Sequence, residues 1–421
     1  MAPAALVKKA VRFMGRQVRE VREGGLRVFF RKSWASAMIV LMTPVILVVR
    51  ALRPIALIRF GLLPSPRMGH FAGNTELYLC ERDLGLQNNR AIDIFYLDPT
   101  FVCNTQLKKM WCRILYVSWF ARWLDKTNRL LPGCEKHVIP MRDEDYDFRG
   151  VLSQTRVHLC FTPEEERFGR AAVRSIGIPE GSPYVCLFAR DSAYLDRLHT
   201  YYSREHWRYH DYRDSDILNC IAAAEELARR GYYVVRMGAL VQKPLPSTLP
   251  QVIDYALNGR TDFLDIFLSA KCSFFLGSTA GLSAIPRAFR RAIAYINFVP
   301  LNADHLLLGS PGSLFIPKKL WLREERRFMT FREIRDSGVG SILRGDQYES
   351  CGIELIENTS EEITSVGVEM DERLKGAWKT TEEDEELQQQ FRSLFKPGVD
   401  RPDPVMRIGA EFLRQHRALL N

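Results

Sequence analysis

A regular alternation of short apolar runs and amphipathic segments between residues 184 and 297 constrains the fold most strongly. The apolar runs are short and rich in Val, Ile, Phe and Tyr, which indicates strands buried on both faces. The segments between them carry apolar residues every three or four positions, as helices do. This alternation predicts right-handed crossovers and a parallel, doubly wound sheet. The predicted strands are 184–188, 232–237, 252–256, 272–276 and 292–297, and the predicted helices are 214–230, 262–270 and 279–289.

The length of 421 residues is enough for two ordinary domains, each with its own core. We therefore predict an α/β protein with two Rossmann-like domains, residues 55–165 and residues 166–345. A basic and apolar segment, residues 1–54, precedes them. Helices within residues 346–421 are expected to pack back on the domains, and on the first domain in particular.

Two helices are predicted near the boundary between these domains. One begins at Thr162, whose hydroxyl precedes Pro163 and is followed three residues later by Glu165, the pattern of a capping box. The other covers residues 105–130 and would carry large apolar residues in register on one side: Trp111, Leu115, Trp119 and Trp123.

The net charge of +9 is concentrated at the N-terminus. Residues 1–60 contain twelve Lys and Arg against Glu20 and Glu23, a net charge of +10, so the remaining chain is nearly neutral. A basic segment attached to a neutral body indicates an acidic surface as the partner of that segment alone. It argues against a nucleic-acid partner, because such proteins are usually basic around their binding site as well.

The N-terminal segment has the pattern of a cationic amphipathic helix followed by an apolar run. One stripe of the helix is apolar: Val7, Val11, Met14, Val18 and Val21. Gly24 and Gly25 are predicted to end this helix, and residues 33–49 then form an uncharged run of seventeen residues, interrupted by Pro44. The run is at the lower limit for a bilayer span, and no small-residue cleavage site follows it.

Three structures fit this segment: a helix lying on an anionic membrane surface, a helix buried against the body, and a true span. We favour the first, because the apolar stripe and the basic residues beside it suit lipid headgroups. The expected location is therefore cytoplasmic, peripheral on the inner face of the cytoplasmic membrane.

The nine cysteines are odd in number, scattered, and never in a CxxC pair. This indicates buried thiols in a reducing compartment and neither a disulfide framework nor a zinc site. His206 and His210 have the spacing of helical zinc ligands, but the sequence offers no third ligand beside them, and we predict no metal site.

The most distinctive local pattern is the end of the strand at residues 272–276. Gly277 closes that strand, and Ser278, Thr279, Ala280 and Gly281 follow where a helix is expected to start. Free backbone N–H groups at a helix start suit a pyrophosphate, and glycine permits its close approach. The alternative is an ordinary Ser or Thr helix cap that binds no ligand.

Charged residues follow the ends of other predicted strands, where ligands of parallel sheets bind. Arg190 and Asp191 follow the strand at 184–188, and Arg236 ends a neighbouring strand. Arginine binds phosphate through two hydrogen bonds and stabilises a departing diphosphate. His70, after a glycine turn, is a candidate general base, with a structural role as the alternative. The loop 192–213 is rich in aromatic residues that could stack on sugar rings.

Several motifs, occurring in order, resemble a family of bacterial glycosyltransferases from surface-polysaccharide loci, distantly similar to fucosyltransferases. They are Arg67-Met68-Gly69-His70, Asn74-Thr75-Glu76-Leu77, Ala189-Arg190-Asp191-Ser192, His210-Asp211-Tyr212-Arg213, Tyr233 to Gly238, Asp262 to Phe267, and Phe275 to Leu282. The resemblance covers roughly residues 55–320. It implies a GT-B-like fold that uses no metal and no cofactor other than its donor substrate. It also implies a nucleotide-binding role for Arg213 and places Arg190 on the donor β-phosphate. A single arginine there, where fucosyltransferase-like enzymes commonly have two, argues against GDP-fucose.

The expected function is transfer of a sugar from a nucleotide-activated donor to a hydroxyl of a lipid-linked saccharide or polysaccharide. Arg190, Arg213, Arg236 and residues 277–281 would bind the donor diphosphate, and His70 or Asp191 would accept the proton of the attacking hydroxyl. Two alternatives remain: an epimerase-like nucleotide-sugar enzyme on the same fold, and a non-catalytic, membrane-associated scaffold.

Overall fold

The structure is a computed structural model that describes most of the chain. It covers residues 3–194, 208–396, 398, 402–403 and 405–421, without the side chains of residues 3–19, 21, 24, 208 and 209. The chain forms two compact units. Unit 1 comprises Met1–Leu63, Asn88–Pro99 and Leu115–Pro140, and unit 2 comprises Pro64–Gln87, Thr100–Ile114 and Met141–Asn421.

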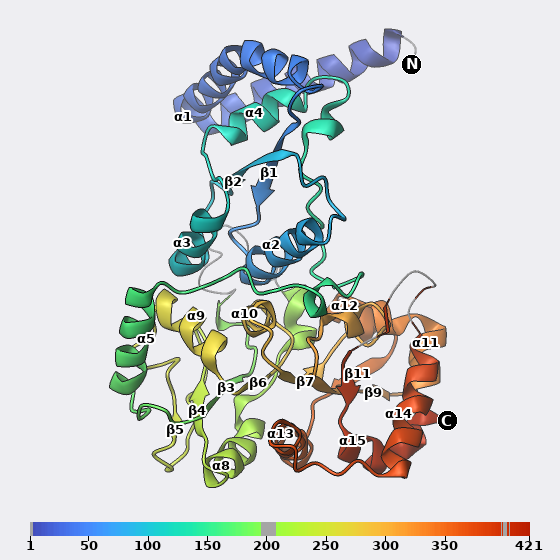
Figure 1. Cartoon of the computed structure of the whole chain (residues 1–421). Helices are drawn as coiled ribbons and strands as arrows, with labels where there is room; N and C mark the ends of the chain where they lie inside the picture. The colour runs from blue at the N-terminus through green and yellow to red at the C-terminus, as the bar shows by residue number, and fades with distance from the viewer. Residues whose placement is uncertain (1–2, 195–207, 397, 399–401, 404) are drawn as a thin grey trace. The chain divides into compact units, whose positions relative to one another are not determined.

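A seven-stranded sheet forms the centre of unit 2 (Figure 1). Its strand order is β12-β8-β7-β6-β3-β4-β5, and each pair of neighbours is parallel, as the sequence predicts. The strands are β3 (Tyr184–Phe188), β4 (Tyr233–Arg236), β5 (Val252–Ile253), β6 (Phe274–Gly277), β7 (Ile293–Phe298), β8 (Leu314–Pro317) and β12 (Arg407–Ile408).

Helices cover both faces of this sheet (Figure 1). On one face, α8 (Ile221–Arg229) packs against α13 (Ser360–Leu374). On the other face, α9 (Asp262–Lys271) packs against α5 (Pro163–Ser175) and α10 (Ala284–Ala288). The capping box of α5 is confirmed, since the Thr162 hydroxyl accepts a hydrogen bond from the Glu165 N–H and the Glu165 carboxylate accepts one from the Thr162 N–H.

Two helices that precede the sheet in sequence complete its second face. Helix α2 (Met68–Asp83) packs against α10, and α3 (Thr105–Ile114) packs against α9. Their residues therefore belong to unit 2. The predicted boundary of a first domain at 55–165 is wrong in this respect, because α2 packs on α10, which begins 216 residues later, and α3 packs on α9, which begins 157 residues later.

The C-terminal part of unit 2 adds a small antiparallel sheet and several helices. The sheet has the order β10-β9-β11, from β9 (Lys319–Leu322), β10 (Arg327–Phe328) and β11 (Ile353–Ile356). The helices are α11 (Phe331–Ser337), α12 (Gly345–Ser350), α14 (Glu382–Leu394) and α15 (Ala410–Gln415). These elements lie in unit 2, and α13 packs against β7, β8 and α15. The expectation that the C-terminal helices pack on the first domain is corrected accordingly.

Among its described residues, unit 1 contains only two strands, β1 (Ile58–Leu63) and β2 (Ile92–Leu97), which pair in parallel. An ion pair joins their side chains, with 2.7 Å between Arg59 Nε and Asp93 Oδ1. Helix α4 (Ala121–Asn128) packs on β1 and β2, and the Tyr96 hydroxyl donates a hydrogen bond of 2.7 Å to Asp125. This unit has too few strands for the Rossmann-like sheet that we expected.

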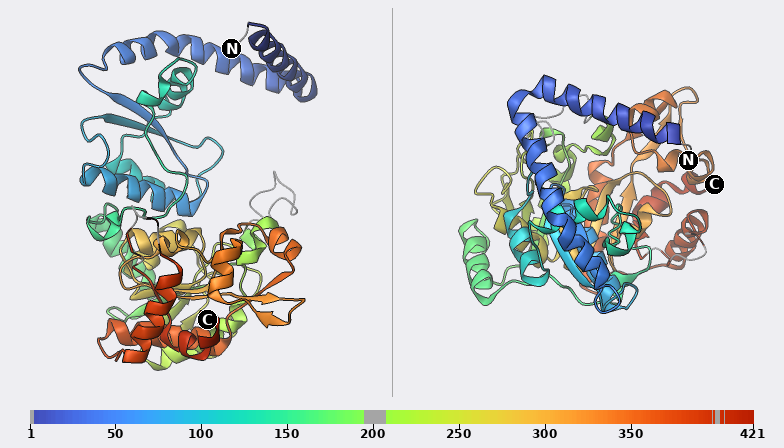
Figure 2. Two further views of the ribbon diagram at one scale, coloured as in Figure 1. Left: turned by 90° about the vertical axis from the view of Figure 1, so that its right-hand side faces the viewer. Right: turned by 90° about the horizontal axis from the view of Figure 1, so that it is seen from above.

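Helix α1 (Pro3–Ala51) dominates unit 1 and bends at Gly25, whose φ of 62° and ψ of −160° are not helical. Figure 2 shows this change of direction clearly. The predicted helix end at Gly24-Gly25 is therefore a bend, and the helix continues beyond it. The apolar stripe Val7, Val11, Met14, Val18 and Val21 falls on side chains outside the described residues.

Two other predicted helices differ in extent from those observed. The helix expected at 105–130 is two helices, because Val117 forms a β-bridge with Phe95 and interrupts it. Trp119 is consequently exposed and does not share one apolar side with Trp111. The helix expected at 279–289 starts only at residue 284, after a 3-10 turn over Gly281–Ser283.

Candidate functional site

The reversal of strand order in the main sheet defines the candidate site. The chain moves outward from β3 to β4 and β5, then returns to form β6 on the other side of β3. The carboxyl ends of β3 and β6 therefore meet, and Phe188 pairs with Gly277. Ligands of open parallel sheets bind at such a switch point, where two loops leave in opposite directions.

The two loops at this point are joined by hydrogen bonds. The Ser278 hydroxyl accepts a hydrogen bond of 2.9 Å from the Arg190 backbone N–H. The Ser278 N–H in turn donates to the Phe188 carbonyl at 3.1 Å. Ser278 is completely buried, so its hydroxyl fixes the turn after β3 and does not face a ligand.

A cavity of about 560 Å³ opens at these strand ends, entirely within unit 2. Its size is in the range of small-molecule sites. Residues from α2, from the turns after β3 and β6, and from the segment before α8 line it. Seven of the predicted site residues are among those that line it: His70, Arg190, Asp191, Arg213, Thr279, Ala280 and Gly281. Gly277, Ser278 and Arg236 are not among them.

Arg190 is the central cation of the cavity. Its guanidinium forms an ion pair with Asp214 and donates a hydrogen bond of 3.2 Å to the His210 carbonyl. Burial and the neighbouring Arg213 lower the pKa of Arg190 to about 10, so it stays protonated at neutral pH. A buried, partly desolvated cation of this kind interacts strongly with an anionic ligand.

Arg213 lies next to Arg190 on the cavity wall. It donates a hydrogen bond of 2.7 Å to Nδ1 of His210, and its guanidinium is 5.6 Å from the centre of the Tyr212 ring. Because its partner is an imidazole and not a carboxylate, that hydrogen bond does not compensate the positive charge of Arg213. The loop 208–213 therefore presents a second cation beside Arg190.

Arg236 has a different environment from that expected. Its side chain is only 1% exposed, and Nη1 contacts both carboxylate oxygens of Asp254 at 3.1 Å. The guanidinium is directed to Asp254, which follows β5, and Arg236 does not line the cavity. Arg236 and Asp254 therefore form a buried ion pair.

Gly277 and Gly281 are required by the packing of the backbone. A Cβ on Gly277 would lie 2.5 Å from the Phe188 carbonyl oxygen, and one on Gly281 would lie 2.9 Å from the Gly69 backbone nitrogen. The second contact brings the start of α2 directly against the turn after β6. Neither Ser278 nor Thr279 caps a helix: the N-caps of the 3-10 turn and of α10 are Ala280 and Ser283, and neither makes a side-chain cap.

The two candidate bases differ in how their polar atoms are used. Asp191 accepts backbone hydrogen bonds on both carboxylate oxygens, from Ala193 at 2.9 Å and from Gln242 at 3.0 Å. It thus ties the loop after β3 to the loop after β4. His70 lies in the first turn of α2, half-buried, and lines the cavity.

A second group of polar residues on the cavity wall has no recognisable signal in the sequence. Arg287 of α10 forms an ion pair of 3.0 Å with Asp145, and the Tyr146 hydroxyl hydrogen-bonds Nδ1 of His305 at 3.1 Å. Burial lowers the pKa of His305 to about 3, so this imidazole is neutral. These residues come from three distant segments, and no local motif marks them.

A further ion pair, between Asp265 and Arg260, lines the cavity. Burial raises the pKa of Asp265 to about 6, although Arg260 at 2.6 Å and the Tyr255 hydroxyl at 3.1 Å oppose that shift. Arg260, Asp265 and Tyr194 line the cavity. The other aromatic residues expected to stack on sugars, Tyr201, Tyr202 and Trp207, lie outside the described residues, as does His206; the side chain of Tyr209 is also outside them.

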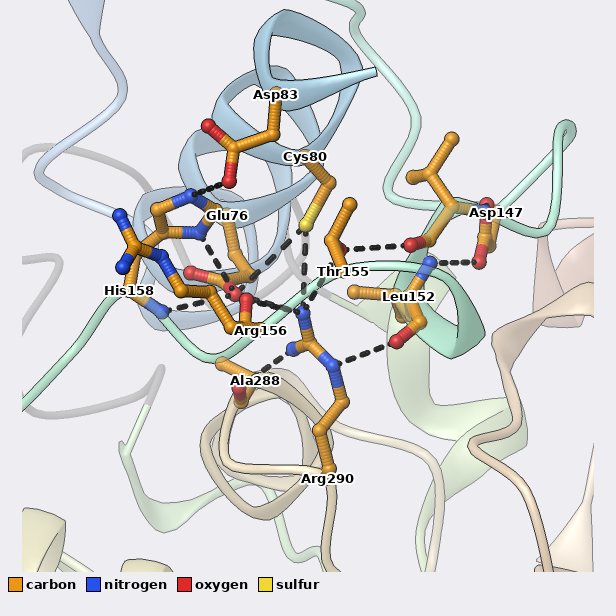
Figure 3. Close-up of polar contacts among 11 residues, drawn as sticks. Glu76, Cys80, Asp83, Asp147, Leu152, Thr155, Arg156, His158, Ala288 and Arg290 are labelled. Atoms are coloured by element: carbon orange, nitrogen blue, oxygen red, sulfur yellow. Dashed lines mark hydrogen bonds and ion pairs between the residues drawn. The ribbon is translucent and has the colours of Figure 1, made fainter.

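Glu76, Cys80 and His158 bring three metal-ligating atoms within 4.8 Å of one another, away from the cavity. Arg290 already supplies a cation there: its Nη2 is 2.9 Å from Glu76 Oε1 and 3.3 Å from Cys80 Sγ (Figure 3). Burial lowers the pKa of His158, but hydrogen bonds with Cys80 and Glu76 outweigh it and raise the pKa to about 10. Two cations thus balance the acidic groups, and we interpret the cluster as an ion-pair network that holds α2 against the segments on either side.

No protein-family model and no curated protein matches the chain. Among solved structures, it is similar to the ADP-heptose lipopolysaccharide heptosyltransferase II of E. coli, with 13% identity, a TM-score of 0.36, and coverage of 62% of this chain and 90% of that one. It is also similar to a glycosyl transferase of family 9 from Veillonella parvula, with 11% identity, a TM-score of 0.41, and coverage of 76% and 97%. A third similar structure is the iron-containing dodecameric glycosyltransferase TibC of enterotoxigenic E. coli, with 10% identity, a TM-score of 0.29, and coverage of 58% and 59%.

Proposed function

We propose that the chain is a glycosyltransferase that binds a nucleotide-activated sugar in the cavity at the β3–β6 switch point. The observation that carries the proposal is a pair of adjacent cations in the cavity at the carboxyl ends of β3 and β6: Arg190, which follows β3, and Arg213, which precedes α8. A diphosphate placed there meets two fixed guanidinium groups in a largely desolvated setting. Such groups stabilise the charge that develops on a departing nucleoside diphosphate.

The remaining polar groups of the cavity fit the sugar part of such a donor. Asp145, Tyr146 and neutral His305 offer hydrogen-bond acceptors and donors on one wall, next to Arg287. Sugar hydroxyls need both kinds of partner, and a buried neutral imidazole can serve as either one. We propose that this wall orients the transferred sugar.

The reaction would be a direct displacement at the anomeric carbon. The acceptor hydroxyl attacks that carbon, the bond to the diphosphate oxygen breaks, and a base receives the hydroxyl proton. We assign the base to His70, because Asp191 uses both of its carboxylate oxygens to hold the two loops together. Removal of the His70 imidazole is expected to lower turnover by a factor of about 10²–10⁴.

The acceptor is proposed to be a lipid-linked saccharide or polysaccharide of the cell surface, as the motif resemblance implies. No nucleic acid and no cofactor other than the donor enter this proposal.

Two measurements test the proposed function. Thermal melting with a panel of nucleoside diphosphates should give a concentration-dependent rise for at least one of them, because a ligand of the folded state stabilises it by mass action. Mass spectrometry of products, with and without an acceptor, should then show transfer only when the acceptor is present. An isomeric nucleotide sugar of unchanged mass, separated from the donor by chromatography and formed without acceptor, would indicate an epimerase. No turnover of any bound donor would indicate a scaffold.

A further inference from the structure

After its bend, α1 has one apolar face that is exposed to solvent. Residues 33–49 contain no charged residue. Five large side chains of this stretch are more than half exposed: Trp34 at 60%, Val40 at 72%, Leu41 at 61%, Leu47 at 54% and Val48 at 58%. A helix that faces water normally carries polar residues on that side. Contiguous apolar surface of this kind marks an interaction site.

The other side of the same helix is already occupied by protein. Met38, Met42 and Ile46 are 5%, 5% and 0% exposed, respectively, and α1 packs against α4 along this side. Met38 and Met42 form one cluster with Trp123 of α4, and Ile46 forms another with Phe60 of β1. The helix is therefore apolar on both sides, with only one side covered.

The stretch Gly25–Ala51 is long and apolar enough to cross a membrane by length and composition. The packing argues against a crossing. A spanning helix would bring α4 into the hydrocarbon, together with charged Arg122 and Lys126 and the buried Asp125. Charged side chains at that depth are costly. A helix that lies in the membrane plane keeps α4 on the aqueous side and buries only the exposed apolar face.

The charge of unit 1 identifies the kind of surface that it fits. Unit 1 contains 17 Lys and Arg against six Asp and Glu, whereas the whole chain has a net charge of +9. Unit 2 is therefore slightly acidic. A second copy of the same face would bring two strongly cationic surfaces together, but an anionic bilayer attracts them. Exposed Trp34, Trp119 and Tyr116 are residue types favoured at the headgroup level.

We propose that the outward face of residues 34–48 of α1 lies in the plane of an anionic lipid bilayer, at the boundary of headgroups and acyl chains, without crossing it. The face acts independently of the proposed sugar transfer, so either proposal can fail alone. Apolar burial supplies the attachment, and the basic residues on both flanks, such as Arg27, Arg31 and Arg53, make it depend on lipid charge.

Flotation of the full-length chain with lipid vesicles tests the face. Protein synthesised without cells, in the presence of phosphatidylcholine vesicles with or without phosphatidylglycerol, should float mainly with the anionic vesicles. The double variant Val40→Glu/Val48→Glu should reduce the floated fraction by about tenfold or more, because carboxylates cannot enter the acyl region cheaply. The matched control is Phe168→Glu/Leu257→Glu, which changes two similarly exposed apolar residues of unit 2 and should float as wild type does.

Protease added outside the vesicles separates an in-plane helix from a span. An epitope attached before residue 1 should be digested along with one attached after residue 421, since both ends stay on the same side. Protection of the N-terminal epitope would overturn the proposal in favour of a span. Equal flotation of the wild type and the α1 variant would also overturn it. So would a wild type that fails to float and instead forms a dimer that the α1 variant loses.

Discussion

At the scale of single residues, four of the five described arginines that line the cavity differ in how their charges are neutralised. Arg260 and Arg287 are bound to Asp265 and Asp145, and Arg190 is bound to Asp214. Arg213 donates to an imidazole instead. A phosphate ligand must share the first three with their carboxylates but can take the full charge of Arg213. Of these four, we therefore expect Arg213 to contribute most to the affinity for nucleoside diphosphates.

The variant Arg213→Gln tests this expectation. Loss of a charge-assisted hydrogen bond costs about 1.5–3 kcal/mol, so the dissociation constant for the best nucleoside diphosphate should rise by one to two orders of magnitude. The melting temperature without ligand should change little, because the side chain is half-buried and its partner is an imidazole and not a carboxylate. Titration calorimetry measures the first quantity and circular dichroism the second. Unchanged affinity would remove this loop from the donor site.

Arg236→Gln should give the opposite result. Breaking a buried ion pair leaves Asp254 without its cation and destabilises a protein by about 3–5 kcal/mol. The free energy of unfolding from urea titration should fall accordingly, while folded protein keeps its affinity for the diphosphate, because Arg236 does not line the cavity. Weak binding by fully stable Arg236→Gln protein would contradict this assignment.

Gly281 shows how one residue can mislead a reading of sequence. The glycine-rich turn suggested room for a phosphate, yet the place that a Cβ on Gly281 would take is occupied by the Gly69 backbone. Gly281→Ala should therefore destabilise the protein by about 1–3 kcal/mol, as overpacking does. Gly367→Ala is the control: it lies within α13, where a Cβ meets Leu276 at an ordinary 3.6 Å, and it should be neutral or slightly stabilising. If Gly281→Ala and Gly367→Ala unfold at the same urea concentration, the backbones at Gly281 and Gly69 can move apart without cost.

At the scale of elements, the parallel sheet could be predicted because its strands are local apolar runs joined by local helices. The residues Arg190, Asp191, Thr279 and Gly281 follow from that pattern, since strand ends converge in any parallel sheet. The second wall could not be predicted: Asp145, Tyr146 and His305 meet only through contacts between distant segments. The prediction of one helix over residues 105–130 is wrong for a similar reason. A β-bridge between Val117 and Phe95, which are distant in the sequence, interrupts the local helical pattern.

The ion-pair network of Arg290 determines where α2 lies, and with it the position of His70. Arg290 also donates hydrogen bonds to the carbonyls of Leu152 and Ala288, at 2.8 and 2.6 Å (Figure 3). The network thus joins α2, α10 and the connecting segment that contains His158. Helix α2, which carries the candidate base His70 in its first turn, is thus held in place by ion pairs of Glu76 and Asp83 farther along the helix.

The pH dependence of stability tests this network. The folded-state pKa of His158 is about 10 against an ordinary value of 6.5, so its contribution is complete below pH 6.5 and is lost as the pH rises through 10. The difference in unfolding free energy between wild type and His158→Gln should accordingly shrink between pH 7 and pH 10. Urea titrations at pH 7, 8.5 and 10 measure it. A difference that stays constant over this range would mean that His158 is neutral in the folded protein.

At the scale of the whole molecule, the two units are interleaved in sequence. The chain passes between them at residues 63–64, 87–88, 99–100, 114–115 and 140–141. The boundary was predicted at residue 165 because the capped helix α5 begins nearby, at Pro163. Sequence patterns do not reveal that α2 and α3 belong with later helices, because the faces they bury are apolar whichever partner covers them.

This interleaving predicts that residues 166–421 do not fold alone. Without α2 and α3, the buried faces of α10 and α9 would be exposed to water. The fragment should lack a cooperative thermal transition by calorimetry, while the full chain retains one for unit 2. A sharp transition of the fragment, close to that of the full chain, would restore the boundary at residue 165.

The same interleaving sets an order of events on the ribosome. The apolar face of α1 leaves the exit tunnel first, whereas α2 must wait for α10, whose last residue is Ala288. At roughly 5–20 residues per second, the interval between the synthesis of α2 and that of α10 is on the order of 10–40 s. A nascent chain that touches a bilayer early would spend that interval anchored at a surface. Aggregation of half-made chains would then be limited by the lipid and not only by chaperones.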